Sequence, residues 1–277
     1  MPHDFVFPDS PYLAAPGQAF DLADRSTTAD VFASRKAAKA AARDCGEAIA
    51  EWTEVLYANA GERDAPKVLI LLQGMDTSGK DGTTKALFRN TPPLNVKVKP
   101  FKAPTKPELA HDFLWRVHKA VPGKGQITVF NRSHYEDVLV VKVREFADAK
   151  TVEQRYAQIN EFERMLAESG TLILKFMLHI SHEVQGERLR ARLERPDKRW
   201  KFNPGDLEDR KLWPDFMDAY ETMVRRCSTE HAPWYVIPSD DKKTRNALIA
   251  QIVQQALEQL KLNIPDPGYR PEDFDIQ

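Results

Sequence analysis

The sequence has few cysteines and no long apolar run. Cys45 and Cys227 are the only cysteines among 277 residues and lie far apart, which favours free thiols in a reducing compartment and leaves one disulfide as the alternative. The histidines show no HxH or HExxH spacing, which argues against a zinc site. Apolar runs such as Val68 to Leu72 are far shorter than the ~18 residues of a membrane span, and the N-terminus lacks the basic start and apolar core of a signal peptide. We therefore expect a cytoplasmic protein that contacts no membrane.

An excess of charge of one sign is also missing. Forty Lys and Arg residues balance 41 Asp and Glu residues, for a formal net charge of −1. This balance marks the chain as neither a globally basic nucleic-acid binder nor an acidic tail protein. Apolar residues make up 42% and charged residues 29%, which is typical of a globular chain, and the length suits one large domain with appendages.

Short apolar runs alternate with amphipathic stretches along most of the chain. The runs predict strands at residues 67–73, 96–98, 126–130, 171–178 and 234–237. Helical periodicity covers about residues 26–59, 80–90, 106–120, 151–168, 181–194, 214–228 and 240–261. Strands and helices that alternate at this spacing predict an α/β fold of three layers, with a parallel five-stranded sheet covered on both faces.

The two ends of the chain depart from this alternation. Residues 1–25 contain four prolines and scattered aromatics, which predicts an extended arm packed on its own domain or on a neighbour. We expect an N-terminal arm and long helix at 1–60, the main domain at 61–262, and a proline-rich, acidic tail at 263–277.

A phosphate-binding pattern follows the first predicted strand. Residues 74–80 fit G-x-x-x-x-G-K between a strand and a helix. Glycines let backbone N–H groups turn inward, and the helix N-terminus and the lysine add positive charge. The pattern predicts a phosphate cradle, with a glycine-rich structural turn as the alternative. The predicted cradle residues are Gly74, Thr77, Ser78, Gly79, Lys80, Gly82 and Thr83.

Two carboxylates make this loop unusual. Asp81 takes the position after the lysine, where Ser or Thr normally holds Mg²⁺. Asp76 lies inside the loop, where its charge repels phosphate unless a cation lies between them. Asp76 is therefore a candidate metal ligand, and a turn-stabilising aspartate that bonds to its own backbone is the alternative.

Three motifs in order resemble those of the family-2 polyphosphate kinases. They are GMDTSGKDGT at 74–83, FNRSHYED at 130–137, and RPDKRWKF at 195–202 followed by Pro204, Gly205 and Asp206. The resemblance runs from about residue 30 to 262. It implies a P-loop kinase fold with a helical lid and an N-terminal helical extension. It also implies transfer of a terminal phosphoryl group from inorganic polyphosphate to AMP or ADP, with Mg²⁺, or Mn²⁺ in its place, as the cofactor.

The second motif supplies the predicted acceptor and metal residues. Many family members carry Asp-Arg-Ser where this chain begins the triplet with Asn131, and this resembles the subgroup that accepts AMP as well as ADP. We expect Arg132 to contact phosphate, unless it forms an internal ion pair, and Asp137 to join Asp76 at the metal. The predicted acceptor site is a set of four polar side chains, Asn131, Arg132, His134 and Glu136. The alternative for Glu136 and Asp137 is to cap the next helix.

Two basic stretches complete the predicted site. Residues 185–213 contain nine Lys and Arg against six acids, and downstream of a P-loop we interpret them as a lid. The lid would close Arg192, Arg195 and Arg199 onto phosphate, and a solvated helix with ion pairs is the alternative. Residues 80–119 carry nine Lys and Arg against three acids, which fits a polyphosphate channel that includes Lys102. Surface lysines kept for solubility are the alternative there.

Two other function classes stay open at this point. An ATP-dependent kinase of a nucleoside monophosphate or small molecule would carry Ser or Thr after the loop lysine, which this chain lacks. A non-catalytic binder of RNA leaves Asp76 and Asp81 unexplained. The long N-terminal helix and the family resemblance favour a homodimer or homotetramer. Its expected partners are polyphosphate and adenine nucleotides, with guanine nucleotides as an extension and no nucleic acid.

Overall fold

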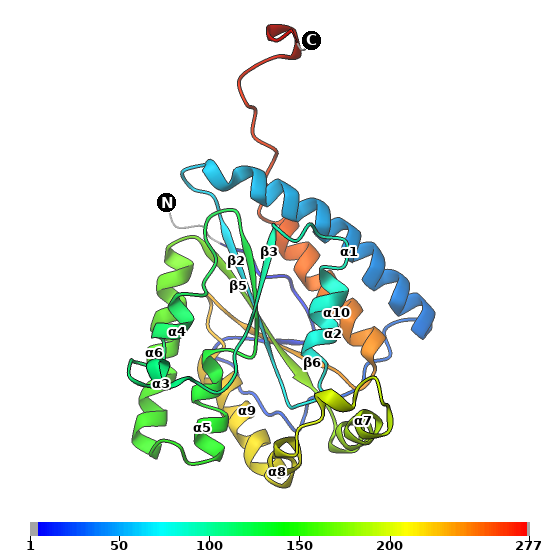
Figure 1. The fold of residues 1–277 in the computed structure, drawn as a ribbon, viewed down its shortest axis with the longest axis vertical. Helices are drawn as coiled ribbons and strands as arrows, with labels where there is room; N and C mark the ends of the chain where they lie inside the picture. The colour runs from blue at the N-terminus through cyan, green and yellow to red at the C-terminus, as the bar shows by residue number, and fades with distance from the viewer. Residues whose placement is uncertain (1–4, 276–277) are drawn as a thin grey trace.

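The computed structural model describes residues 5–275, which form one six-stranded sheet with helices on both faces (Figure 1). The strand order across the sheet is β1-β6-β5-β2-β4-β3. Strands β2 to β6 run parallel, while β1 pairs antiparallel with β6 at one edge. The strands are β1 (Leu13–Ala14), β2 (Lys67–Gln73), β3 (Val96–Pro100), β4 (Ile127–Asn131), β5 (Thr171–His179) and β6 (Trp234–Pro238).

The five parallel strands are the five that the sequence predicts, and the sixth strand is a correction. The N-terminal arm supplies it: the Val236 N–H donates to the carbonyl of Tyr12 at 2.8 Å, and the Tyr235 hydroxyl donates to the carbonyl of Pro8 at 2.8 Å. A two-residue strand is too short to show alternation in sequence. Of the two placements considered for the arm, the structure has it packed on its own chain.

Two sets of helices flank the sheet, and a third group lies at its carboxyl edge (Figure 1). Helices α1, α2 and α10 cover one face, α4, α5, α6 and α9 cover the other, and α7 and α8 lie beyond the strand ends. The helices are α1 (Arg35–Ala58), α2 (Lys80–Leu87), α3 (Lys106–Leu109), α4 (Trp115–His118), α5 (Val140–Val143), α6 (Ala149–Glu168), α7 (His182–Glu194), α8 (Gly205–Lys211), α9 (Trp213–Cys227) and α10 (Lys242–Glu258). Single turns of 3-10 helix are η1 (Asn59–Gly61), η2 (His134–Asp137), η3 (Arg199–Lys201) and η4 (Pro271–Asp273).

The centre of the sheet is buried on both faces. Every residue from Val68 to Leu72 in β2 is 0% exposed. Alternate side chains enter two cores: Leu69 and Leu71 pack with α6 and α9, and the others pack with α1 and α10. Because both faces are covered, the strand reads as an unbroken apolar run, and the phosphate loop that follows it starts from a rigid element.

Local side-chain bonds move several predicted helix boundaries. The helix expected over 26–59 begins only at Arg35, where the Ser34 hydroxyl accepts from the Ala37 N–H at 3.1 Å. The helix expected over 106–120 is split into α3 and α4, because the Asp112 carboxylate accepts from the Leu114 N–H at 3.0 Å and turns the chain between them. Helices α5 and α8 have four and seven residues and are too short for a periodic signal.

Outside these elements, residues 263–275 run away from the body of the molecule beyond α10 (Figure 1). Cys45 and Cys227 are both buried and free, so they form no disulfide with each other. Within residues 5–275, no helix is both long and apolar enough to cross a bilayer.

Candidate active site

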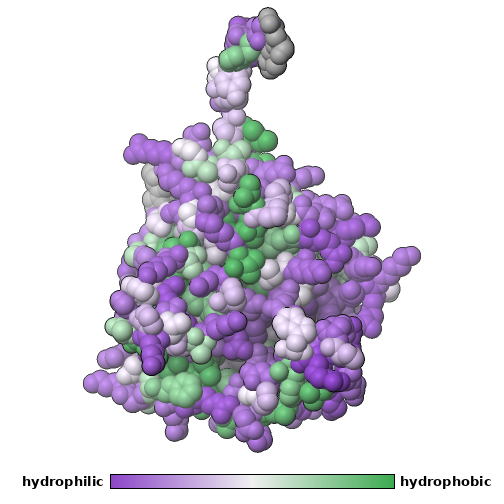
Figure 2. Space-filling model, in the orientation of Figure 1, coloured by the Kyte–Doolittle hydropathy of each residue, from purple (hydrophilic) through white to green (hydrophobic). Residues whose placement is uncertain are grey.

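The carboxyl ends of the central strands open into a cavity of about 480 Å³. It lies between the loop after β2, the end of β4, and α7 with the segment that follows it. Figure 2 shows a hollow in the lower half of this face, rimmed by hydrophilic side chains. The lining residues are Asp76, Thr77, Gly79, Lys80, Asp81, Gly82, Asn131, Arg132, Arg188, Ala191, Arg192, Arg195, Lys198, Lys201, Lys242 and Arg245.

Two glycines of the loop after β2 are required by space as well as by conformation. Gly74 has φ +138°, and a Cβ there would lie 2.6 Å from the carbonyl oxygen of Leu178. Gly79 has φ +114°, and a Cβ there would lie 2.0 Å from the guanidinium of Arg245. Both positions therefore admit only glycine if the loop keeps its shape, because any side chain would meet backbone or a buried arginine.

Lys80 is the first residue of α2 and lies almost completely buried beneath the loop. Its Nζ donates to the carbonyls of Gly74 at 2.6 Å and Met75 at 3.2 Å. Burial, together with the nearby charge of Arg132, lowers the pKa of Lys80 to about 8. The ammonium is thus held at the floor of the cavity, where a bound phosphate would stabilise its charged form.

Two arginines hold the loop from behind, and neither was among the predicted site residues. Arg188 of α7 donates to the carbonyls of Thr77 at 2.9 Å and Ser78 at 3.2 Å. Arg245 of α10 donates to the carbonyl of Ser78 at 2.7 Å, and burial lowers its pKa to about 9. The two guanidiniums thereby satisfy the carbonyls of Thr77 and Ser78 and fix the backbone of the loop. Arg188 lies within the basic stretch predicted as a lid at 185–213, but no local pattern marks Arg245.

The loop carboxylate pairs with the arginine of the second motif. Asp76 accepts from Arg132 at 2.5 Å, and Arg132 also donates to Glu136 at 3.2 Å. Burial works to raise the pKa of Asp76, but the positive charges of Arg132 and Lys80 outweigh it and hold the pKa below its usual value. Arg132 has φ +61°, a left-handed conformation at the turn after β4 that aims its side chain back toward the loop.

A second acid, Asp206 of α8, lies near Asp76. It belongs to the third motif but was not among the predicted site residues. It accepts from Arg192 of α7 at 3.2 Å and is almost completely buried. Burial and the charge of Asp76 raise the pKa of Asp206 to about 6. The Asp76 carboxylate therefore has a second acid close by, and α7 is tied to α8 at the cavity edge.

Asn131 lines the cavity beside Asp81, the residue after the loop lysine, where other phosphate loops carry a Ser or Thr hydroxyl. Its side-chain amide donates to Asp81 at 2.6 Å, and Lys201 of η3 approaches the same carboxylate at 3.5 Å. The second motif is thereby linked to the start of α2 and to the predicted lid.

Two residues of the second motif do not reach the cavity. His134 is 0% exposed, and its Nε2 lies 3.1 Å from the Glu163 carboxylate, which also accepts from Lys175 at 2.6 Å. His134 therefore belongs to a buried polar cluster behind β4, which contradicts its placement at the acceptor. Asp137 pairs with Arg155 of α6 at 3.2 Å, and burial raises its pKa. Its carboxylate faces α6, so the structure does not bring Asp137 to Asp76.

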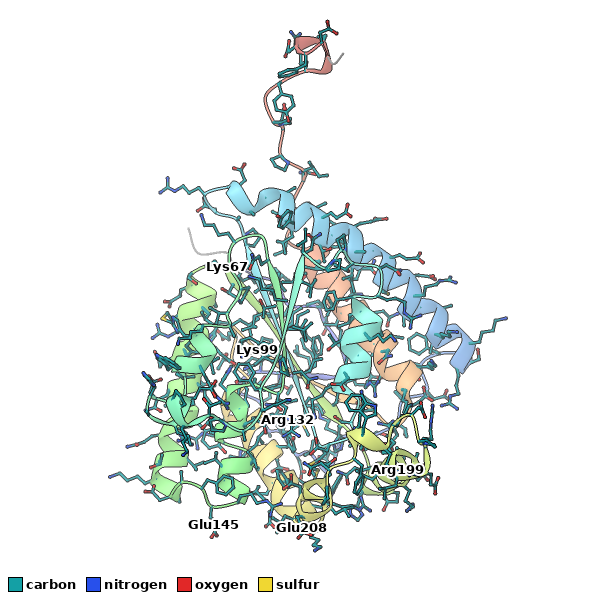
Figure 3. All side chains as sticks on the ribbon, viewed as in Figure 1. Lys67, Lys99, Arg132, Glu145, Arg199 and Glu208 are labelled. Carbon is teal, nitrogen blue, oxygen red and sulfur yellow. The ribbon has the colours of Figure 1, made fainter. Side chains whose placement is uncertain are left out.

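The predicted phosphate-binding residues divide into three groups. Those that line the cavity are Thr77, Gly79, Lys80, Gly82, Arg192 and Arg195. Ser78 and Thr83 are buried behind the loop, and Gly74 lines a smaller neighbouring cavity with Glu136. Lys102 and Arg199 are exposed and do not line the active-site cavity. The Arg199 guanidinium, labelled in Figure 3, donates to the carbonyl of Leu193 at 2.8 Å.

The oxygen donors of the loop suit a hard cation better than a zinc ion. Asp76 lines the cavity, and the buried hydroxyl of Thr77 finds no hydrogen-bond partner among the described residues. Over residues 5–275, no cluster of three or more His, Cys, Asp or Glu side chains is arranged to hold a metal by itself. A cation here would therefore take part of its coordination from phosphate and water, as Mg²⁺ does.

A sequence profile described as polyphosphate kinase 2 (PPK2) matches residues 33–264. The chain belongs to the polyphosphate kinase 2 family. Among its relatives is an AMP/ADP-polyphosphate phosphotransferase from Meiothermus ruber, 46% identical over 96% of this chain and 99% of the relative. An ADP-polyphosphate phosphotransferase from Rhodopseudomonas palustris is 37% identical over 92% of each chain.

A solved member of the family has the same fold. The crystal structure of polyphosphate kinase 2 from Arthrobacter aurescens superposes with a TM-score of 0.91 at 39% identity and covers 97% of this chain and 96% of that one. This likeness confirms the predicted P-loop kinase fold class. In this fold the loop after β2, Lys80 and several arginines line one cavity at the carboxyl edge of the sheet.

Proposed function

We propose that this polyphosphate kinase 2 transfers the terminal phosphoryl group of inorganic polyphosphate to AMP and ADP, giving ADP and ATP. The observation that carries the proposal is the charge of the cavity. Of the described residues that line it, nine are Lys or Arg and two are Asp. A polyanionic donor and a nucleotide phosphate together supply the negative charge that such a cavity needs.

The arrangement supports transfer by positioning and charge neutralisation. A phosphate oxygen of the acceptor attacks the terminal phosphorus of polyphosphate, the P–O bond to the next phosphate breaks, and its electron pair leaves on the shortened chain. Lys80 and the loop amides would hold the phosphate next to this bond, and Arg132, paired with the loop carboxylate Asp76, lines the same cavity. Because the reacting groups are held in line and their charge is balanced, no covalent enzyme intermediate is needed.

Mg²⁺ is our proposal for the cofactor, with Mn²⁺ as the substitute. Asp76 would hold it, because its oxygen lies at the cavity and the paired Arg132 can shift to a phosphate. Bound there, Mg²⁺ would neutralise charge on the phosphates and orient them. Asp137 stays a predicted second ligand only if its ion pair with Arg155 opens, and the charge of Asp76 acts on Asp206.

The lid and the assembly are further parts of the proposal. Arg192 and Arg195 already line the cavity, while Arg199 would need the segment at about 185–213 to move before it reached phosphate. We also propose a cytoplasmic homodimer or homotetramer that uses adenine nucleotides, with guanine nucleotides as a second class of acceptor.

The test of the function is a product assay. Purified protein, Mg²⁺ and long-chain polyphosphate are mixed with AMP or with ADP, and the nucleotides are separated by ion-exchange chromatography. We expect ADP and ATP from AMP, and ATP from ADP. Product from ADP alone would remove the AMP-accepting role inferred from Asn131, and turnover only with ATP as donor would favour a nucleoside monophosphate kinase.

A pH profile tests the role of Lys80. The lysine is charged below its pKa, so its attraction for phosphate is complete only well below pH 8 and weakens as the pH rises through about 8. We expect kcat/KM for polyphosphate to fall on this alkaline side. The Lys80→Arg variant, which stays charged, should lose that limb even if its activity is lower. An unchanged limb in the variant would assign the titration to another group.

A further inference from the structure

A cluster of charged and polar side chains lies in the core behind β4, on the face of the sheet that α6 and α9 cover. Lys175 of β5 and Glu163 of α6 form an ion pair at 2.6 Å, and both side chains are 0% exposed. His134 and Tyr135 of η2 complete the cluster and are also 0% exposed. None of these four side chains lines the active-site cavity, so they take no direct part in binding phosphate there.

The Glu163 carboxylate is the centre of the cluster. Its Oε1 accepts from the Tyr135 hydroxyl at 2.8 Å and from His134 Nε2 at 3.1 Å. Its Oε2 accepts from the Lys175 ammonium at 2.6 Å. Burial works to raise the pKa of Glu163, but the charge of Lys175 and the hydrogen bond from His134 outweigh it and hold the pKa below its usual value. The carboxylate is therefore ionised and accepts all three hydrogen bonds.

The Lys175 ammonium joins this carboxylate to two further elements. It donates to the Tyr135 hydroxyl at 2.8 Å and to the carbonyl of Cys227, the last residue of α9, at 2.6 Å. An ammonium has three donors, and here each of them meets an acceptor. One side chain thus holds β5, α6, η2 and the end of α9 together through directional bonds.

A buried ion pair is a weak source of stability. The desolvation of two charges can exceed their attraction, and apolar side chains of similar volume often make a core equally stable. Aromatic rings surround the ammonium, which lies 5.1 Å from the centre of the Trp234 ring and 5.2 Å from that of Tyr135. Stability alone therefore gives little reason for charges at this point of the core, whereas the fixed direction of their hydrogen bonds does give one.

The cluster fixes the turn that carries the second motif. His134 and Tyr135 point into the cluster, away from the cavity. Arg132, labelled in Figure 3, and Glu136 face the phosphate loop instead, where they pair with each other at 3.2 Å. Arg132 also pairs with Asp76 of the loop. Because these side chains follow one another along a single short turn, a shift of the two buried ones moves the two that face the loop.

The same turn is also tied to the strand that leads into the phosphate loop. Gln73 ends β2 directly before Gly74, and its side-chain amide donates to the Ser133 hydroxyl at 3.0 Å. That hydroxyl also accepts from the Tyr135 N–H at 3.2 Å. The turn is thereby held between the start of the loop on one side and the Glu163 carboxylate on the other.

We propose that Glu163 and Lys175 are positioning residues for phosphoryl transfer, which hold η2 so that Arg132 stays aligned with the phosphate loop. The inference rests on the proposed function. Neither side chain reaches the cavity, and their effect passes through the hydrogen bonds that Tyr135 and His134 donate to Glu163. A misplacement of about 1 Å can lower the rate of a reaction about a hundredfold. A loosened turn should therefore lower kcat, while the loop and its lysine keep KM for polyphosphate.

The test compares two double variants that both remove the ion pair. The acceptor variant is Lys175→Met with Glu163→Gln, which keeps a carbonyl oxygen for Tyr135 and His134. The apolar variant is Lys175→Met with Glu163→Leu, which removes that oxygen. We expect kcat of the acceptor variant to stay within about threefold of wild type and kcat of the apolar variant to fall about thirty- to hundredfold. KM for polyphosphate should stay within about threefold in both variants.

Two further variants separate positioning from stability. Ile49→Ala in α1 opens the core on the other face of the sheet, so it lowers the melting temperature without touching the turn. Below its melting transition this control should keep kcat within about twofold of wild type. Tyr135→Phe keeps the ring and removes one hydrogen bond to Glu163, so kcat should fall about three- to tenfold even if the apolar variant does not fold.

Each other outcome overturns one specific claim. Equal kcat in the acceptor and apolar variants, an equal loss in Ile49→Ala, or an unchanged kcat in Tyr135→Phe would refute the positioning role and leave the proposed function intact. Absence of polyphosphate-dependent turnover in the wild type would refute the proposed function itself. Hydrogen exchange then still tests the turn: the amides of residues 132–137 should exchange faster in the apolar variant than in the acceptor variant, and equal exchange would refute the claim that Glu163 holds them.

Discussion

Lys80→Ala is expected to lower kcat/KM for polyphosphate by roughly a thousandfold while the chain stays folded. The Lys80 ammonium lies beneath the loop, with its Nζ 2.6 Å from the Gly74 carbonyl oxygen, at the floor of the cavity. Without it, the loop amides still bind phosphate, but charge that develops during transfer loses its closest full positive partner.

Steady-state kinetics and thermal melts together check this result. Lys85→Ala is the matched control, because Lys85 belongs to the same helix but is exposed and does not line the cavity. The control should keep near wild-type kinetics. Turnover of Lys80→Ala within a few fold of wild type would remove Lys80 from the site, and loss of the melting transition would mean that its bonds to the loop carbonyls are needed for folding.

The second large effect concerns the loop carboxylate. Asp76→Asn is expected to lower kcat by about a hundredfold or more and to raise the Mg²⁺ concentration for half-maximal activity by about tenfold. The change keeps the shape of the side chain but removes the charge that would hold the cation. It also leaves Arg132 with Glu136 as its remaining carboxylate partner.

A metal titration distinguishes the two roles open to Asp76. If Asp76 only anchors Arg132, the variant should lose stability and activity without any change in its Mg²⁺ requirement, and the proposed ligand would be wrong. Asp44→Asn serves as the control, since Asp44 is exposed on α1 and forms an ion pair with neighbouring Arg43, far from the loop in sequence. Its Mg²⁺ titration should match that of the wild type.

The predicted strands were correct because their apolar runs face cores on both sides. The prediction of β2 also predicts the loop and the helix that follow it, because the residues of a phosphate loop are consecutive in sequence. The same local signal located Asp76 and Lys80, and the second motif supplied Arg132, which the structure brings to Asp76 in an ion pair.

Residues of the second and third motifs were harder to assign, because neighbours in sequence point to different places. Arg132 turns toward the loop, while His134, two residues on, is buried against Glu163. Arg195 lines the cavity, while Arg199 bonds back to the Leu193 carbonyl. In a 3-10 turn or an irregular segment the side-chain direction changes at each residue, and no periodic rule predicts which one faces the substrate.

The sequence by itself determined the class of the fold, the phosphate loop and the family, because each depends on patterns within a few tens of residues. Tertiary structure alone decided which distant groups complete the site. Arg245 reaches the Ser78 carbonyl across 167 residues of chain, and Asp206 comes close enough to Asp76 for the two charges to interact only once α8 is packed in place. It also separated the basic stretch at 80–119 into a buried Lys80 and exposed side chains such as Lys85 and Lys102. Long-range contacts of this kind arise from packing geometry, which leaves no local mark in the sequence.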